Sequence, residues 1–396
     1  MSKSLLPGIV AGALLIAVAP GGARPALAAE PYQMNAVMPL TGSGAFLGKG
    51  EKRSLELLEK FVNDAGGIKG RPLQFVYHDD QSDPAVGVQL ASGIVAKKPA
   101  VILGSSLVAI CRAMSPLVQN GGPVQYCFSP GLHPASGSYS FTASVSTYDL
   151  AQLAIRYFRQ KGWTRIAFLF STDATGQDAE NGFMQILAMP ENKDMKVVAK
   201  AHFNITDVSI AAQVATIKAA QPQAFVAWST GTPIATVFRG MLQANLDVPM
   251  ATTDGNMTYE QMKSYASFLP KQLYIPAGQY VIRDPSLVPA DVSKEQAQFY
   301  RIFDAAGVKP DEPSELAWQP AMIVVHALQR LSPDASAEQI RDFIAHLKDS
   351  SSIDGTLDFQ KVPQRGLDVS NAVMTLWNPQ KQIWEVVSKP GGAPLH

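Results

Sequence analysis

Residues 34–77, MNAVMPLTGSGAFLGKGEKRSLELLEKFVNDAGGIKGRPLQFVY, hold the pattern that decides the fold. Two short apolar runs, Met34–Met38 and Leu73–Tyr77, have the length of buried strands. Between them, apolar residues recur at helical spacing through 55–62, and Gly66-Gly67 supplies a helix stop. A strand, a helix and a second strand in this order predict one unit of a parallel α/β sheet.

The same alternation continues along the chain. Asp83 before Pro84 is typical of a helix N-cap, and Asp207 is expected to cap a helix that ends at Ala220. Further strands are expected at 101–103, 124–128, 166–170, 196–203, 224–228, 249–252 and 273–276. The tail differs, with helices expected at 293–306, 315–330 and 336–348 and strands at 356–359, 373–377 and 383–387. Two α/β blocks with a mixed tail predict two similar lobes whose last segments cross back and forth.

Composition excludes several classes of protein. The 396 residues include 33 Lys+Arg and 33 Asp+Glu, so no excess of positive charge is available for binding nucleic acid. A hydrophobic content of 46% supports a large core rather than an acidic disordered chain. Two Cys cannot build a disulfide scaffold or a multi-thiolate zinc site.

The N-terminus has the layout of a secretory signal peptide. An apolar run from Leu5 to Val18 precedes Ala26-Leu27-Ala28, a small-x-small pattern that predicts cleavage near Ala28 and export to the periplasm. A membrane anchor is the alternative, but the run is shorter than the ~20 residues that a spanning helix needs. Cleavage removes Lys3 and Arg24 and no acid, which leaves a slightly acidic mature chain.

Export changes how the two cysteines are interpreted. In an oxidising compartment, Cys111 and Cys127 become a candidate disulfide, with two buried thiols as the alternative.

Motifs for catalysis and cofactors are absent or imperfect. Gly42-Ser43-Gly44 with Gly48 has G-x-G-x-x-x-G spacing, one residue longer than a dinucleotide fingerprint, although a helix start of this kind can hold an anion. The chain lacks G-x-S-x-G and H-E-x-x-H, and His133 stands in a Pro/Gly loop where a solvated side chain is expected. We therefore expect no catalytic residue, no metal and no cofactor, and the chain is not expected to be an enzyme.

The segments that follow the predicted strands indicate binding instead. Ligands of open parallel sheets bind beyond the carboxyl ends of the strands. These segments are mostly small, hydroxyl-bearing or aromatic, and Asp173 and Asp254 are their only acids. Such a composition is typical of a binding pocket rather than of an acid–base catalytic site.

Three motifs in order resemble those of a known family. They are Pro39-Leu40-Thr41-Gly42, the run 62–73 (VNDAGGIKGRPL), and 78–84 (HDDQSDP). Together they resemble the branched-chain amino acid-binding family of ABC-transporter periplasmic binding proteins, with the type I fold, over the whole mature chain. The aromatic or hydrophobic carboxylate-binding branch of that family is the nearest resemblance.

The resemblance implies an α/β fold of two doubly wound parallel-sheet lobes joined by three crossovers. Residues 29–146 with 284–352 would form lobe 1, and residues 147–283 with 353–396 would form lobe 2. It also implies one small carboxylate-bearing solute in the cleft, an ABC permease of the inner membrane as partner, and a monomer. In the same alignment Cys111 and Cys127 lie on the rim of one lobe, which favours a disulfide between them.

The site carried over from the family departs from the pattern of its amino acid binders. Hydroxyls and backbone amides usually hold the substrate carboxylate, but here Ala109 and Ile110 stand in the first of those loops. Leu47 and Thr175 fall where tyrosines are usual, and Asp254 falls where an acid pairs with the ligand ammonium. The expected ligand-binding residues are Phe46, Leu47, Ala109, Ile110, Phe128, Ser129, Thr175, Trp228, Asp254 and Tyr280.

This largely apolar and aromatic set favours an aromatic or other hydrophobic carboxylate. A hydrophobic or branched-chain amino acid is the alternative, and Asp254 would then take the ammonium. A different class is an exported ligand-sensing module that signals through a receptor.

Overall fold

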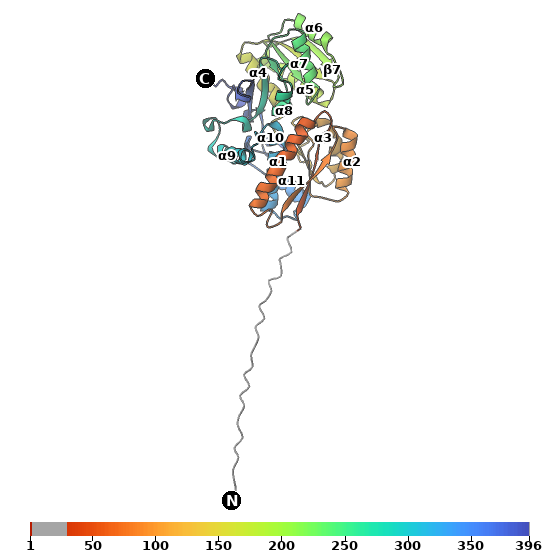
Figure 1. Ribbon diagram of the computed structural model, residues 1–396, viewed down its shortest axis with the longest axis vertical. Coiled ribbons are helices and arrows are strands. Elements are labelled where there is room, and N and C mark those ends of the chain that lie inside the picture. The colour runs from red at the N-terminus through yellow and green to blue at the C-terminus, as the bar shows by residue number, and fades with distance from the viewer. Residues whose placement is uncertain (2–29, 396) are drawn as a thin grey trace.

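The computed structural model describes Met1 and residues 30–395. The predicted signal peptide, residues 1–28, lies outside the described residues apart from Met1. From residue 30 onward the chain forms two parts, each built on one sheet, which Figure 1 shows as an orange part and a yellow-green part.

The first part contains a five-stranded sheet in which every neighbouring pair is parallel. Its strands lie in the order β2-β1-β3-β4-β5, with helices in every connection except that between β4 and β5. The elements are β1 (Tyr32–Met38), α1 (Ala45–Asp64), β2 (Leu73–Asp79), α2 (Pro84–Val95), β3 (Val101–Leu103), α3 (Val108–Met114), β4 (Val124–Cys127) and β5 (Ser140–Thr142). The strand β5 was not expected, because Ser140 and Thr142 interrupt any apolar run and a Ser/Gly/Pro-rich stretch precedes it.

The second part contains a seven-stranded sheet in the order β14-β13-β10-β9-β8-β6-β7. Strands β6 to β10 pair in parallel, and β13 and β14 add an antiparallel hairpin at one edge. The elements are α4 (Thr147–Gln160), β6 (Arg165–Ser171), α5 (Ala174–Leu187), β7 (Lys196–Phe203), α6 (Ala211–Ala219), β8 (Ala224–Trp228), α7 (Ile234–Gln243), β9 (Met250–Ala251), α8 (Tyr259–Ser264), β10 (Leu273–Gly278), β13 (Ala372–Asn378) and β14 (Ile383–Val386).

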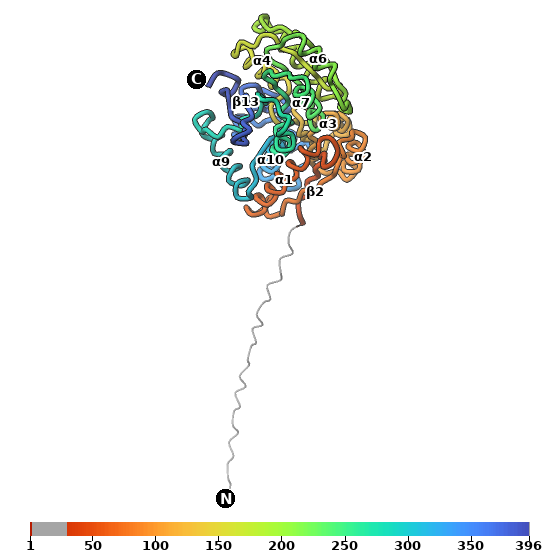
Figure 2. Tube along the Cα trace, turned by 45° about the horizontal axis from the view of Figure 1, so that its top comes forward, coloured from red at the N-terminus to blue at the C-terminus, as the bar shows by residue number. Residues whose placement is uncertain are grey.

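The tail connects the two parts. It contains α9 (Ala290–Ala305), α10 (Glu312–Arg330), α11 (Ala337–Ala345) and the small hairpin of β11 (Ser350–Ser352) and β12 (Gly355–Leu357). Helix α10 packs along α1, and α11 contacts β4, so the tail first returns to the first part and then joins the second sheet through β13 (Figure 2). The chain therefore crosses between the parts three times, and the residue bounds given above for the two lobes remain a prediction.

Most helix starts follow the capping residues in the sequence. The Asp83 carboxylate accepts from Ala85 N ahead of α2, and Ser336 opens α11 with a capping box. The prediction that Asp207 caps a helix is wrong: α6 begins at Ala211, and the Asp207 carboxylate instead accepts from Asn204 N at 2.8 Å. The side chain closes a local turn in place of capping the helix.

Burial follows the layers. Both sheets are covered by helices and are rich in fully buried side chains, including Phe168, Phe225 and Trp228 of the second sheet. Within the described residues, no helix is both long enough and apolar enough to span a membrane.

Candidate functional site

A small cavity lies between the two parts, at the carboxyl ends of strands from both sheets. Its volume is about 20 Å³, which is room for about one water molecule. We call it the cleft site. It is lined by Leu47, Ser106, Val108, Ser129, Pro130, Gly131, Thr147, Thr175, Asp178, Trp228, Thr230, Thr253, Asp254, Gly255 and Leu316.

Half of the residues expected at the site line this cavity. They come from both parts of the fold: Leu47 and Ser129 from the first, and Thr175, Trp228 and Asp254 from the second. Their role in binding a ligand remains a prediction.

The other five expected residues lie elsewhere, for reasons of side-chain direction. Phe46 lines a separate groove beside α8, and Ala109 is half-buried outside the lining. Ile110 is buried in a small core cluster against α2, on the opposite face of α3 from Val108. Two further aromatic side chains, Phe128 and Tyr280, are fully buried in the main core.

Sequence reasoning missed several lining residues. Ser106 and Val108 come from the same loop and helix start as Ile110, shifted by two to four positions. Thr147 and Leu316 belong to helices α4 and α10, which do not follow a strand of the expected pattern, so loop position gave no signal for them.

Backbone geometry places Thr175 at the cavity. Asp173 caps α5 by accepting from Gly176 N at 3.1 Å, and its carboxylate also accepts from the Ser171 hydroxyl at 2.6 Å. A side chain at Gly176 would lie 1.9 Å from the Ser171 carbonyl oxygen. Glycine there lets the helix begin directly against the end of β6, which turns Thr175 into the cleft.

Two acids line the cavity, and their surroundings differ. Asp178 lies 3.1 Å from Arg112 Nη2 and 3.0 Å from His133 Nε2, so its charge has nearby partners. Asp254 is 1% exposed; its Oδ1 accepts from the Thr253 hydroxyl at 2.7 Å and from Gly255 N at 2.8 Å. Its Oδ2 accepts from no amide, hydroxyl or basic side chain in the described residues, and the carboxyl that interacts with Asp254 is that of Glu312.

Behind Asp254 lies a group of buried carboxyls, which we call the carboxyl cluster: Asp254, Glu312, Glu315 and Asp354. Burial raises the pKa of all four, and each is further influenced by at least one other member of the cluster. Glu312 interacts with Asp254, and Glu315 with Asp354, so each pair favours sharing one proton over holding two charges.

The carboxyl cluster joins segments that are distant in the sequence. Glu312 and Glu315 come from the first turn of α10, whereas Asp354 stands between β11 and β12 and accepts from Tyr280 N at 3.1 Å. On the same side of the cleft, the buried Arg365 guanidinium donates to the carbonyls of Ala143 and Ser144, and also to those of Pro130 and Leu132. The three connections between the parts are therefore tied to one another by buried polar groups.

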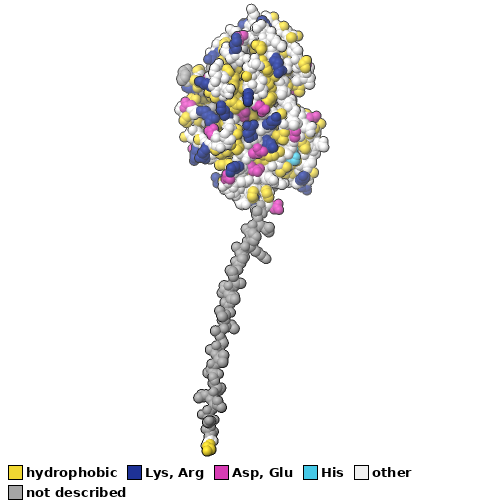
Figure 3. Space-filling view, in the orientation of Figure 1, with side chains coloured by type: hydrophobic (Ala, Val, Ile, Leu, Met, Phe, Trp, Pro, Cys, Tyr) yellow, Lys and Arg dark blue, Asp and Glu magenta, His cyan; other side chains and the backbone are white. Residues whose placement is uncertain are grey.

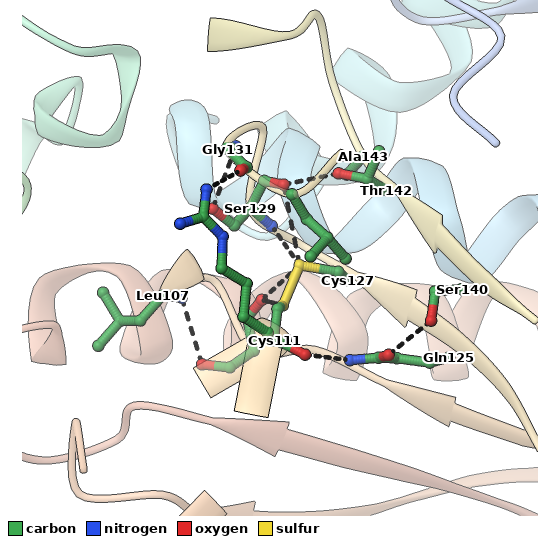
Figure 4. The surroundings of a disulfide bond; sticks show 12 residues. Leu107, Cys111, Gln125, Cys127, Ser129, Gly131, Ser140, Thr142 and Ala143 are labelled. Carbon is green, nitrogen blue, oxygen red and sulfur yellow. Dashed lines mark hydrogen bonds between the residues drawn. A yellow bond between two sulfur atoms is a disulfide. The ribbon is translucent and has the colours of Figure 1, made fainter. Parts of the chain in front are cut away.

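A disulfide fixes the rim of the cavity in the first part. Cys111 and Cys127 are bonded, with their Cα atoms 5.9 Å apart, which confirms the predicted bridge. Figure 4 shows the bridge between α3 and the end of β4, beside Ser129. The Ser129 carbonyl accepts from the Thr142 hydroxyl at 2.6 Å, so the bridge and this hydrogen bond hold one wall of the cleft in place.

The cleft site has no feature of a metal centre. Nowhere in residues 30–395 are three or more His, Cys, Asp or Glu side chains arranged to hold a metal ion.

The sequence pattern of the periplasmic binding protein family matches residues 32–368. The chain belongs to this family. It is a type I periplasmic binding protein of the branched-chain amino acid family, and family members bind small solutes, work with ABC permeases and are periplasmic or extracellular.

Curated relatives match over limited stretches. The Leu/Ile/Val-binding protein homolog 2 of Brucella abortus is 35% identical over 104 residues, which is 26% of this periplasmic binding protein and 26% of the relative. The substrate-binding protein BasB of a chemotactic signal transduction system in Halobacterium salinarum is 27% identical over 32% of this chain and 33% of the relative. The matched stretch thus spans a quarter to a third of the length of these relatives.

Solved structures share the fold over nearly the whole chain. The branched-chain amino acid transporter substrate-binding protein LivJ of Streptococcus pneumoniae, solved with isoleucine, has a TM-score of 0.76 at 18% identity, covering 91% of this chain and 100% of that one. A type 1 periplasmic binding protein of Bordetella pertussis has a TM-score of 0.75 at 19% identity, covering 90% and 99%. At these identities the likeness establishes the fold alone.

Proposed function

We propose that this protein is the solute-binding component of an ABC importer and that it binds a small hydrophobic α-amino acid in the cleft site. The observation that carries the proposal is Asp254, a buried acid that lines the cavity and whose Oδ2 accepts from no amide, hydroxyl or basic side chain in the described residues. A ligand ammonium would donate to this carboxyl and would offset the charge that Asp254 and Glu312 otherwise limit by sharing a proton.

A complementary group stands on the opposite wall. Ser106 lines the cavity from the first part, and its hydroxyl interacts with the buried Glu51 carboxyl but with no other hydrogen-bond partner in the described residues. Ser129 of the first part and Thr147 of α4 also line the cavity, so hydroxyl donors for a carboxylate are available. One polar wall for each end of the ligand fits an amino acid better than a molecule with a single charged group.

The body of the ligand would contact apolar side chains. Leu47, Val108, Trp228 and Leu316 line the same cavity and come from both parts of the fold. Because the free volume is about 20 Å³, a solute of this size enters only when the two parts separate, and it is then enclosed when they close. The mechanism is closure without covalent chemistry, and the closed outer surface signals the loaded state to the permease.

An aromatic or hydrophobic acid without an ammonium is the second candidate, and sequence alone favours it. Trp228 provides a broad aromatic wall, and a proton shared between Asp254 and Glu312 would lower the negative charge that such an acid meets. Ser106 and Asp254, which could interact with the two ends of an amino acid, favour the amino acid as the first candidate.

Matched pairs of ligands test the proposal. Isothermal titration calorimetry would compare leucine with 4-methylpentanoate, and phenylalanine with 3-phenylpropanoate, which differ only in the ammonium. We expect at least one amino acid to bind 100-fold more tightly than its partner, equivalent to ~2.7 kcal/mol. Equal or tighter binding of the simple acids would overturn the amino acid assignment and favour the second candidate.

A ligand-sensing role is compatible with the same site, since the matched stretch of BasB belongs to a chemotactic system. Loss of uptake of the bound solute after deletion of the gene supports import. A lost behavioural response with unchanged uptake would instead show the sensor.

A further inference from the structure

A second and larger hollow lies between the two parts of the fold. It has a volume of about 540 Å³, within the range of small-molecule sites, and we call it the α1–α8 groove. One wall comes from α1 and the loop before α10, and the other from α8, the segment after it and the β13–β14 hairpin. Adjacent residues of α1 separate the two hollows: Phe46 lines the groove, and Leu47 lines the cleft site.

Cations that form no salt bridge with the described residues surround the groove; burial raises the pKa of Asp311, and the charge of Arg53 among these cations lowers it in part. Arg53, Lys263 and Lys309 line it, are exposed, and form no salt bridge with any described residue. Figure 3 shows Lys and Arg side chains, with a few acids among them, across the middle of the face toward the viewer. The groove contains two acids: Glu260, and Asp311, whose oxygens accept from Ser314 Oγ and Tyr259 N.

Aromatic side chains form the inner surface. Trp377 is 7% exposed and lines the groove, with its ring centroid 4.9 Å from that of Trp384 and 6.3 Å from that of Tyr259. The indole Nε1 of Trp377 is buried and has no acceptor in the described part of the chain. An indole N–H can only donate a hydrogen bond. A buried indole N–H without an acceptor in the protein therefore favours a ligand that brings an acceptor oxygen to it.

We propose that the α1–α8 groove is a second binding site, separate from the cleft site, for a small aromatic carboxylate. The ring would pack against Phe46 and Trp377, and the carboxylate would lie among Arg53, Lys263 and Lys309. The cleft site favours a positively charged ligand group beside Asp254, whereas the groove favours a negatively charged one. One molecule therefore does not suit both sites equally. The groove assignment does not depend on the amino acid proposed for the cleft.

A ligand bound in the groove would change the affinity of the cleft for its own ligand. Both hollows have walls from both parts of the fold, so each changes shape when the parts move relative to one another. A groove ligand that binds one relative arrangement of the two parts more tightly changes the affinity of the cleft for its own ligand. The cleft ligand changes the affinity of the groove by the same factor.

Fluorine NMR of the 5-fluorotryptophan-labelled protein tests the proposal with 2-naphthoate as the probe. The chain has five Trp, and single Trp-to-Phe variants assign their signals. We expect the Trp377 signal to shift saturably with 2-naphthoate and at least tenfold more weakly with the neutral 2-naphthamide. The Trp228 signal reports the cleft separately, so a failure at one site is distinguished from a failure at the other.

Charge variants provide the matched comparison. Arg53→Gln and Lys309→Gln should each weaken binding of 2-naphthoate about fivefold, as for an exposed ion pair, and the double variant more than tenfold. Lys98→Gln is the control, because Lys98 is exposed and does not line the groove. A Trp377 signal that does not move, or that moves equally with the amide or in the double variant, would overturn the proposal. Thermal melts of each variant confirm that it is folded.

Discussion

The cleft site and the α1–α8 groove are both made by the same two parts of the fold, yet they differ in size and in charge. The cleft has about 20 Å³ of free volume, hydroxyls and two buried acids, with no lysine or arginine in its lining. The groove has about 540 Å³, aromatic side chains and cations at its rim. The larger hollow is therefore not the one at the carboxyl ends of the strands, where open parallel sheets bind their ligands.

The difference shows that burial, more than volume, determines what each hollow can recognise. A buried carboxyl such as Asp254, whose Oδ2 accepts from no amide, hydroxyl or basic side chain in the described residues, favours one complementary donor, because water does not reach it. Water screens exposed cations such as Arg53, so each anion is attracted only weakly and anions of similar size are attracted about equally. We expect high selectivity in the cleft and lower selectivity in the groove.

The largest expected effect is the loss of charge in the cleft. Asp254→Asn keeps the shape of the side chain but leaves the ligand ammonium without a counter-ion, so the affinity for the preferred amino acid should fall by about 3 kcal/mol, or more than 100-fold. Calorimetry measures this loss, and the Trp377 signal with 2-naphthoate should be unchanged. An amino acid affinity within threefold of the natural protein would contradict the role given to Asp254.

The next effect is on stability and concerns the buried Glu51 on α1. Burial raises its pKa from 4.5 to about 8, the nearby Ser106 hydroxyl lowers the pKa in part, and Asp80 raises it. The native state therefore holds the proton more tightly than the unfolded chain, and the stability this gives is present below pH 4.5 and lost as the pH rises through about 8.

Glu51→Gln mimics the protonated side chain and removes this pH dependence. Relative to the natural protein, the variant should gain about 3 kcal/mol in free energy of unfolding between pH 5 and pH 8. Urea unfolding at the two pH values measures the change. A difference between the two proteins that does not vary with pH would show that Glu51 is not held protonated.

The disulfide gives a smaller effect on stability and tests one wall of the cleft. Replacing Cys111 and Cys127 together by serine opens a loop with a sequence separation of 16, which should lower the free energy of unfolding by about 2 kcal/mol. Because the bridge lies beside Ser129, amino acid binding should weaken, whereas 2-naphthoate binding in the groove should not. Equal weakening at both sites would mean that the bridge stabilises the whole first part and not the cleft wall.

Much of the fold could be predicted from the sequence, because the spacing of apolar residues and the residues that cap helices depend on short stretches of the chain. The strand–helix–strand unit at 34–77 and the capping box at Ser336 form where the residues predict them. The failure at Asp207 shows the limit: an acid before a helix has more than one backbone N–H to accept from, and the sequence does not say which one it takes.

Half of the expected cleft residues line the cavity, and the direction of the side chain explains why others lie outside it. Ser129 lines the cavity, whereas Phe128, one residue earlier in extended chain, points into the core. Val108 and Ile110 are two residues apart in a helix and face opposite directions. Position in a loop therefore predicts which segments surround the cavity, but the structure is needed to tell which of their side chains point into it.

The smallest expected effect separates paired from unpaired cations in the groove. Lys271 lines the groove with Arg53, but it is already bonded to Asp247, and both side chains of that pair are more than half exposed. Lys271→Gln should therefore weaken 2-naphthoate binding less than twofold, against about fivefold for Arg53→Gln, and change stability by less than about 0.5 kcal/mol. Fluorine NMR titrations of the two variants measure the difference. If both variants lose affinity equally, the groove attracts anions through its overall charge. The ion pair with Asp247 would then not reduce the contribution of Lys271 to binding.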